Sequence, residues 1–294
     1  MRLLVAISGV LLLCGARLPA AEPPVLAPAS AWNLRYDEQA CRLVRMFGTG
    51  DDSITFTMAR YGFGSGFELL LAGKGLDPRG SSLRFRFLPA SDYNVLDDPL
   101  YGTGPEGVTA WQFGGSLVPA ERSKAIERLS EKARADEWRA AEAAARDLVT
   151  GFEMRSGMKR SFILDTGKLD KALAALDTCI DDLVSTWGYD PARIRSLARA
   201  PQPRSNPGRW FDPSDYPSES YYAGKSGIVR FRLDVDEDGT PVRCVIQGSY
   251  TDPAFEETVC RVLMQKARFE PAIDAQGERV AAYWQNSVMW LASR

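Results

Sequence analysis

The chain has 294 residues, of which 45% are hydrophobic, 25% charged and 10% aromatic, a composition typical of folded globular proteins. Its length predicts about two domains. Histidine is absent, which excludes Ser-His-Asp and Cys-His catalysis, histidine-ligated zinc and histidine proton relays. We therefore expect a protein that is not an enzyme and that uses no cofactor or metal ion. The net charge is −2, with acidic and basic residues interspersed, so nucleic acid is not an expected partner.

The first 20 residues have the pattern of a secretory signal peptide. Arg2 gives a positive start, residues 3–16 are an apolar run, and small residues precede Ala21. A membrane-spanning helix needs about 20 continuous apolar residues, and Arg17 interrupts this run after fourteen. We predict a cleaved signal peptide over residues 1–20. The alternative is a protein anchored in the inner membrane by residues 3–16.

Residues 22–199 combine strand-like and helical patterns. Apolar and polar residues alternate over 32–36, 54–58, 67–71 and 83–87, as in half-buried strands. Residues 119–148 and 169–184 have the apolar spacing of helices, and two short apolar segments between them, 148–154 and 162–164, are expected to return to the sheet. These patterns predict an antiparallel β-rich domain with added helices, and thus an α+β protein.

The prolines between residues 200 and 208 mark a boundary. Three of these nine residues are prolines, which favours an extended linker. We therefore predict domains over 22–199 and 209–294, joined by a linker over 200–208.

The mature chain has four cysteines, an even number that suits disulfides in an oxidising compartment. Four cysteines allow three pairings. The predicted boundary favours Cys41 with Cys179 and Cys244 with Cys260, because each pair then lies within one domain.

A sequence motif at residues 162–167 resembles the signature of aspartic proteases. It places Asp165, Thr166 and Gly167 after three apolar residues. Aspartic protease catalysis needs two carboxylates that share one proton, and the chain has no second copy of the motif, so a homodimer would be required. Capping of the following helix by Asp165 or Thr166 explains the same residues, and we favour it.

The C-terminal segment contains an ordered series of motifs. These are Tyr216-Pro217, a strand from Gly227, the turn Asp236-Glu237-Asp238-Gly239, a strand over 242–246, a helix from Pro253 that closes on Arg268-Phe269-Glu270-Pro271-Ala272, and a last strand over 280–291. In this order they resemble the TonB C-terminal domain over residues 216–292. The six residues Asp234 to Gly239 also look like the start of a calcium loop, but the twelfth position is Val245, where such a loop has its bidentate glutamate.

The resemblance implies a small antiparallel sheet packed on two helices, whose last strand pairs with an extended peptide of an outer-membrane receptor. Such strand addition uses an exposed strand edge. In this sequence the corresponding peptide-binding edge strand carries four alternate residues on one face, Tyr283, Gln285, Ser287 and Met289. Trp284, Asn286, Val288 and Trp290 alternate with them, and one of the two faces is expected to be core.

The resemblance also suggests location and partners. It implies the periplasm, with a TonB-dependent outer-membrane receptor or another envelope protein as partner, and a homodimer is a further possibility. Energy transducers of this family combine an uncleaved membrane helix that carries a histidine with a long proline-rich spacer. This chain has neither, and nine extended residues reach less than about 30 Å. We therefore favour an exported, non-enzymatic interaction protein, with an anchored energy transducer as the alternative.

Overall fold

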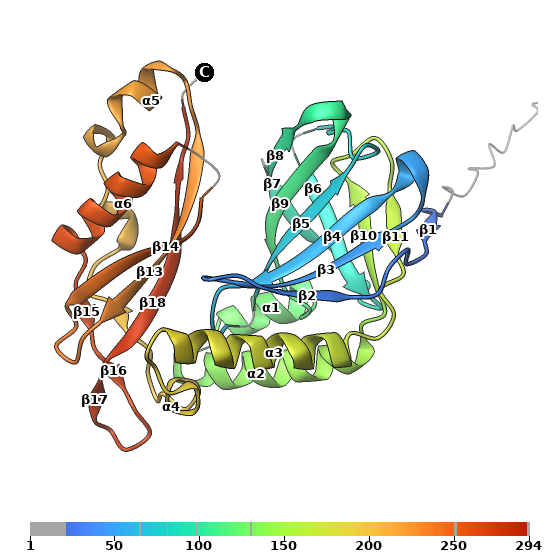
Figure 1. The fold of residues 1–294 in the computed structure, drawn as a ribbon. Helices are drawn as coiled ribbons and strands as arrows, with labels where there is room; N and C mark the ends of the chain where they lie inside the picture. Colours follow the sequence, from blue (N-terminus) through green and yellow to red (C-terminus); the bar gives the residue numbers. More distant parts are fainter. Residues whose placement is uncertain are drawn as a thin grey trace, which may run out of the picture.

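The computed structural model describes residues 22–64, 66–80, 82–97, 99–129, 131–249 and 252–292. The predicted signal peptide lies outside these residues. The fold is α+β, as expected, with most strands in antiparallel sheets (Figure 1).

Two sheets form the centre of the N-terminal part. The larger has the order β2 (Asn33–Tyr36), β3 (Cys41–Phe47), β4 (Ile54–Arg60), β5 (Phe67–Gly73), β9 (Thr109–Gly115) and β8 (Leu100–Thr103). The other has the order β1 (Val25–Leu26), β11 (Phe162–Leu164), β10 (Gly151–Ser156), β6 (Ser82–Leu88) and β7 (Asn94–Asp97). Alternate apolar residues of both sheets meet in one core, where the rings of Phe56 and Phe152 stack with centroids 4.8 Å apart.

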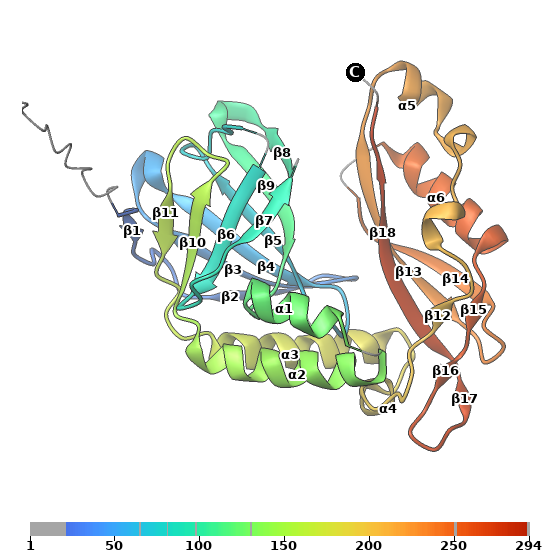
Figure 2. The same cartoon turned by 180° about the vertical axis from the view of Figure 1, so that it is seen from behind.

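Helices lie along one end of these sheets (Figure 2). They are α1 (Ala120–Glu127), α2 (Glu131–Leu148) and α3 (Asp170–Thr186), and the short α4 (Pro191–Arg195) follows α3 next to the C-terminal part (Figure 2). The single helix predicted over 119–148 is thus two helices, and the interruption allows α1 to pack against α2. One face of α3 is buried because Leu173, Leu176 and Ile180 recur at helical spacing.

The predicted capping of α3 by Asp165 or Thr166 is wrong. The helix begins at Asp170, and its N-cap residue Leu169 makes no side-chain capping bond. Asp165 Oδ1 instead accepts a hydrogen bond from the N–H of Gly167 at 3.2 Å, which is an Asx turn.

The C-terminal part is a three-stranded antiparallel sheet covered on one face by a helix. The strand order is β14 (Pro241–Ser249), β13 (Gly227–Val235) and β18 (Ala282–Trp290). Helix α6 (Pro253–Lys266) packs on this sheet, and the short α5 (Ser218–Tyr222) precedes β13. The connections include β16 (Ala272–Ile273), paired with β17 (Arg279–Val280), and the 3-10 turns η3 (Pro207–Arg209) and η4 (Pro213–Asp215).

The β13–β14 turn is fixed by its own residues. Asp236 Oδ1 accepts hydrogen bonds from the N–H groups of Asp238 and Thr240, at 3.0 and 2.8 Å. Gly239 has φ +84°, and a Cβ there would lie 1.9 Å from the carbonyl oxygen of Phe269. Only glycine therefore fits.

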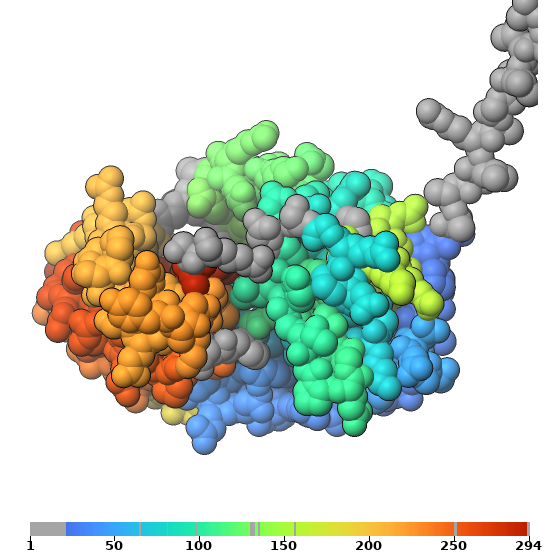
Figure 3. Space-filling view, turned by 90° about the horizontal axis from the view of Figure 1, so that it is seen from above, coloured from blue at the N-terminus to red at the C-terminus, as the bar shows by residue number. Residues whose placement is uncertain are grey.

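The segment over 200–208 is extended but bound to the C-terminal part. Its strand β12 (Gln202–Pro203) pairs antiparallel with β15 (Phe269–Glu270), and the N–H of Arg204 donates to the carbonyl of Arg268 at 2.9 Å. The two parts of the molecule lie side by side (Figure 3).

Each part of the molecule contains one disulfide, and neither disulfide joins the two parts. Cys41 on β3 is bonded to Cys179 on α3, and Cys244 on β14 is bonded to Cys260 on α6. Among the described helices, none is long and apolar enough to cross a membrane.

Candidate functional site

Strand β18 is an edge of the C-terminal sheet. It pairs with β13 along its whole length, from Gly227 opposite Trp290 to Val235 opposite Ala282. In the part of the chain that the structure describes, no other strand pairs with its outer side. Trp284, Val288 and Trp290 pack into the core under α6. The opposite face of the strand carries the four residues expected at the binding edge.

The backbone of β18 directs alternate N–H groups outward. The N–H of Ser287 donates to Oδ1 of the neighbouring Asn286, at 2.8 Å, and we infer from this bond that it points away from β13. Because inward and outward groups alternate in an antiparallel ladder, Tyr283, Gln285 and Met289 also direct their backbone groups to the free side. The edge thus offers the donors and acceptors that strand addition requires.

The first half of β18 is covered on its polar face by the N-terminal part. The cover includes residues 61–64, which follow β4. The N–H of Phe63 donates to the hydroxyl oxygen of Tyr283 at 3.0 Å, and Gln285 Nε2 donates to the carbonyl oxygen of Tyr61. A Cβ at Gly62 would lie 2.6 Å from Gln285 Oε1, so a larger residue here would have to displace the glutamine side chain. The side chains of Tyr283 and Gln285, which were expected to contact a peptide, therefore already form hydrogen bonds with residues 61–63 of the same chain.

The end of α3 completes this cover. The ring of Tyr283 packs edge-on against the rings of Trp187 and Tyr189, with centroids 5.3 and 5.5 Å apart. Burial raises the pKa of Tyr283 to about 12, an effect that the N–H of Phe63 and the charges of Arg232 and Arg195 partly oppose. The phenol is therefore held in its neutral form.

A cluster of buried charged residues lies on β13, next to the contact between β18 and the end of α3. Arg232 and Asp234 on β13 are 2% and 4% exposed, and Arg232 Nε donates to Asp234 Oδ1 at 2.9 Å. Arg243 on β14 donates to the other carboxylate oxygen, and the guanidinium of Arg232 lies 3.9 Å from the ring centroid of Trp187. Burial lowers the pKa of Arg232, while the carboxylate of Asp234 acts in the opposite direction. Each buried charge has a partner, as burial requires.

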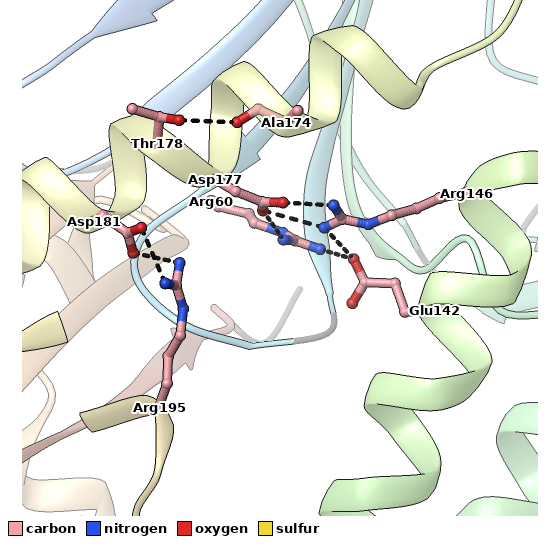
Figure 4. A network of polar contacts seen from close by, with 8 residues as sticks. All are labelled: Arg60, Glu142, Arg146, Ala174, Asp177, Thr178, Asp181 and Arg195. Carbon is pink, nitrogen blue, oxygen red and sulfur yellow. Dashed lines mark hydrogen bonds and ion pairs between the residues drawn. The ribbon is translucent and has the colours of Figure 1, made fainter. Parts of the chain in front are cut away.

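A second ionic network involves Arg60, the last residue of β4, which directly precedes the loop of residues 61–64 that contacts β18 (Figure 4). Arg60 bonds Glu142 of α2 and Asp177 of α3, and Arg146 of α2 bonds the same two carboxylates. These interactions fix the end of β4 to both helices, so the loop reaches the C-terminal sheet from a rigid support.

The second half of β18 is open. Ser287 is half-buried, Met289 is 50% exposed, and Leu291, just beyond the strand, is 67% exposed. A groove of about 280 Å³ lies beside this half, and its lining includes Trp210, Phe211, Trp284, Asn286, Ser287 and Met289. The open edge and the groove are therefore adjacent.

The other candidate residues take ordinary structural positions. Asp165 serves the Asx turn described above, and Asp236 serves the β13–β14 turn. Within the described residues, no group of three or more Cys, Asp or Glu side chains is placed to hold a metal ion.

Comparison with known families identifies the C-terminal part. Residues 212–291 match the model of the family described as Gram-negative bacterial TonB protein C-terminal, which confirms the resemblance seen in the sequence and points to the bacterial cell envelope. A search of curated proteins finds no match to the chain. The family match covers the sheet, α6 and the edge strand but not residues 22–199.

The sequence did not reveal the contact between residues 61–64 and β18. These segments are about 220 positions apart, so no local pattern links them. One signal was present in β13, where Arg230, Arg232 and Asp234 alternate with Val229, Phe231 and Leu233. Charged residues that alternate regularly with core residues on a central strand indicate a second, polar surface that needs partners.

Proposed function

We propose that this protein is an exported, non-enzymatic envelope protein of the periplasm that binds an extended peptide by strand addition to β18. The peptide belongs to a TonB-dependent outer-membrane receptor or another envelope protein. The observation that carries the proposal is the unpaired outer edge of β18 in a domain that matches the TonB C-terminal family. Its outward N–H and C=O groups favour an extended partner.

The open half of β18 is the favoured site of pairing. Its backbone edge is exposed around Ser287 and Met289, whereas the side chains of Tyr283 and Gln285 contact the N-terminal part. In this role the N-terminal part supports the binding domain and limits the length of strand that a peptide side chain can contact.

Substitution at Ser287 tests the proposal. Ser287→Pro removes an outward N–H without removing an inner ladder bond, so peptide binding should be lost while the fold is kept. Ser287→Thr keeps the N–H and should bind like the wild type. The probes are synthetic peptides that span the periplasmic segments of outer-membrane receptors of the host bacterium, measured by calorimetry. Equal binding by the proline variant and the wild type would contradict strand addition.

An anchored energy transducer is the second candidate, because residues 3–16 form an apolar run. Cell fractionation with N-terminal sequencing separates the two. A mature protein that begins near Ala21 and is released with the soluble periplasm supports the exported protein, whereas an intact N-terminus in the membrane fraction supports the transducer.

Protease activity can be tested directly. A casein assay on the wild type and on Asp165→Ala should show no cleavage by either. Cleavage that depends on Asp165 would overturn the non-enzymatic assignment.

A further inference from the structure

The groove beside the open half of β18 has two different walls. One wall consists of β18 side chains on the core face of the strand, including Trp284 and Val288. The other consists of η3 and the two residues that follow it, Trp210 and Phe211. The family match begins at residue 212, so this second wall lies outside the matched segment.

The chemistry of the walls is apolar. The indole N–H of Trp210 already donates to Ser205 Oγ at 2.8 Å, and the ring of Phe211 packs edge-on against Trp290. The rings therefore offer the groove their carbon surfaces, and Asn286 and Ser287 are the polar residues of its lining. Such walls favour an apolar group over a charged one.

The position of the groove matches that of an added strand. Paired strands lie about 4.8 Å apart and direct successive side chains to opposite faces. A strand paired with Ser287 and Met289 would therefore place every second side chain on the face of Trp284 and Val288, above the groove. The volume of about 280 Å³ lies at or below the roughly 300 Å³ lower limit of small-molecule pockets, a size that suits one bulky side chain.

We propose that this groove binds a bulky apolar side chain of the extended peptide that pairs with β18. The inference rests on the proposed function and adds the chemistry that selects the partner: an extended segment with leucine, phenylalanine or tryptophan at one fixed position. The described N-terminus is not the occupant, since β1 pairs with β11 on the side of the N-terminal part away from β18 (Figure 1).

Peptides that differ at one residue test this specificity. The probes are nine-residue threonine- and valine-rich peptides with lysine at both ends, in which the central residue is leucine, tryptophan or serine. Affinities for the full mature chain are measured by fluorescence polarisation of a labelled lysine. We expect the leucine and tryptophan peptides to bind at least tenfold more tightly than the serine peptide.

Two substitutions at Asn286 form a matched pair. Asn286→Ala and Asn286→Phe both release the N–H of Ser287, but only phenylalanine fills the groove. The alanine variant should keep the preference for leucine over serine, and the phenylalanine variant should lose it while still binding the serine peptide. Thermal unfolding checks that both variants fold. Independently, a central iodophenylalanine should quench the indole fluorescence of the wild type more than phenylalanine does, because Trp210 and Trp284 line the groove.

The outcomes separate the two proposals. Equal affinities for all peptides, each abolished by Ser287→Pro, would overturn the side-chain groove and leave strand addition intact. Absence of binding, or binding that Ser287→Pro does not change, would overturn both. Dimerisation that Asn286→Phe abolishes, seen by sedimentation without peptide, would assign the groove to a second copy of the chain and overturn the peptide proposal.

Discussion

The two halves of β18 have the same backbone pairing with β13 but different surroundings. Around Tyr283 and Gln285, the polar face is packed against residues 61–64 and the end of α3. Around Ser287 and Met289, the strand borders an aromatic groove and solvent. One half of an edge strand can thus be covered by another part of the same chain. This cover shortens the exposed part of the strand and lowers the risk of unspecific pairing with other chains that long edges carry.

Loss of the Cys41–Cys179 disulfide should have the largest effect on the covered half. The bond closes a separation of 138 residues, for which the chain-entropy model gives about 5 kcal/mol, and it holds α3, whose end packs on Tyr283. Urea unfolding of Cys41→Ala/Cys179→Ala measures the loss. The control is Cys244→Ala/Cys260→Ala, with a separation of 16 and about 3 kcal/mol. A smaller loss for the first pair than for the second would contradict this ranking.

Asp234→Ala should be the next most damaging change. It leaves the buried guanidinium of Arg232 without its carboxylate, and breaking a buried ion pair costs about 3–5 kcal/mol. The matched control is Glu237→Ala, an exposed site in the adjacent turn, where a change within about 0.5 kcal/mol is expected. Denaturant titration of both variants measures the difference, and similar values would show that the charge cluster does not hold the contact.

Alkaline pH should weaken the contact between Tyr283 on β18 and the N-terminal part. Because the pKa of Tyr283 is raised from 10.0 to about 12 in the folded protein, its contribution is complete below pH 10 and is lost as the pH rises from 10 to 12. The shift corresponds to about 2–3 kcal/mol. Stability measured against pH should therefore fall less steeply over this window in Tyr283→Phe than in the wild type. Parallel curves for the two proteins would contradict the role of Tyr283.

The smallest expected effect comes from adding a single methyl group at Gly62, where residues 61–64 contact β18. Gly62→Ala places a Cβ 2.6 Å from Gln285 Oε1, and overpacking of this kind costs about 1–3 kcal/mol, at the lower end here because the glutamine side chain can shift. Gly64→Ala is the control, since nothing lies within 4 Å of its added Cβ. Thermal unfolding measures both. An equal effect of the two substitutions would argue against close contact at Gly62.

The sequence predicted what depends on local pattern. The alternation along the last strand indicated that one of its faces is core, without saying which, and the glycine of the β13–β14 turn indicated the hairpin. Strand β3 was missed because Arg45 occupies a position that alternation assigns to the core side, where it bonds the carbonyl oxygens of Ser30 and Thr166. The cover of Tyr283 was missed because it joins segments far apart in the chain, and the groove because its walls come from two such segments.

Amide hydrogen exchange along β18, measured by NMR with and without bound peptide, tests the central claim most directly. The inward N–H groups of Val288 and Trp290 should be protected in both states. The outward N–H groups of Ser287 and Met289 should exchange rapidly in the free protein and become protected when a leucine-containing peptide binds. Unchanged rapid exchange at Ser287 and Met289 under saturating peptide would contradict strand addition at the open half of β18.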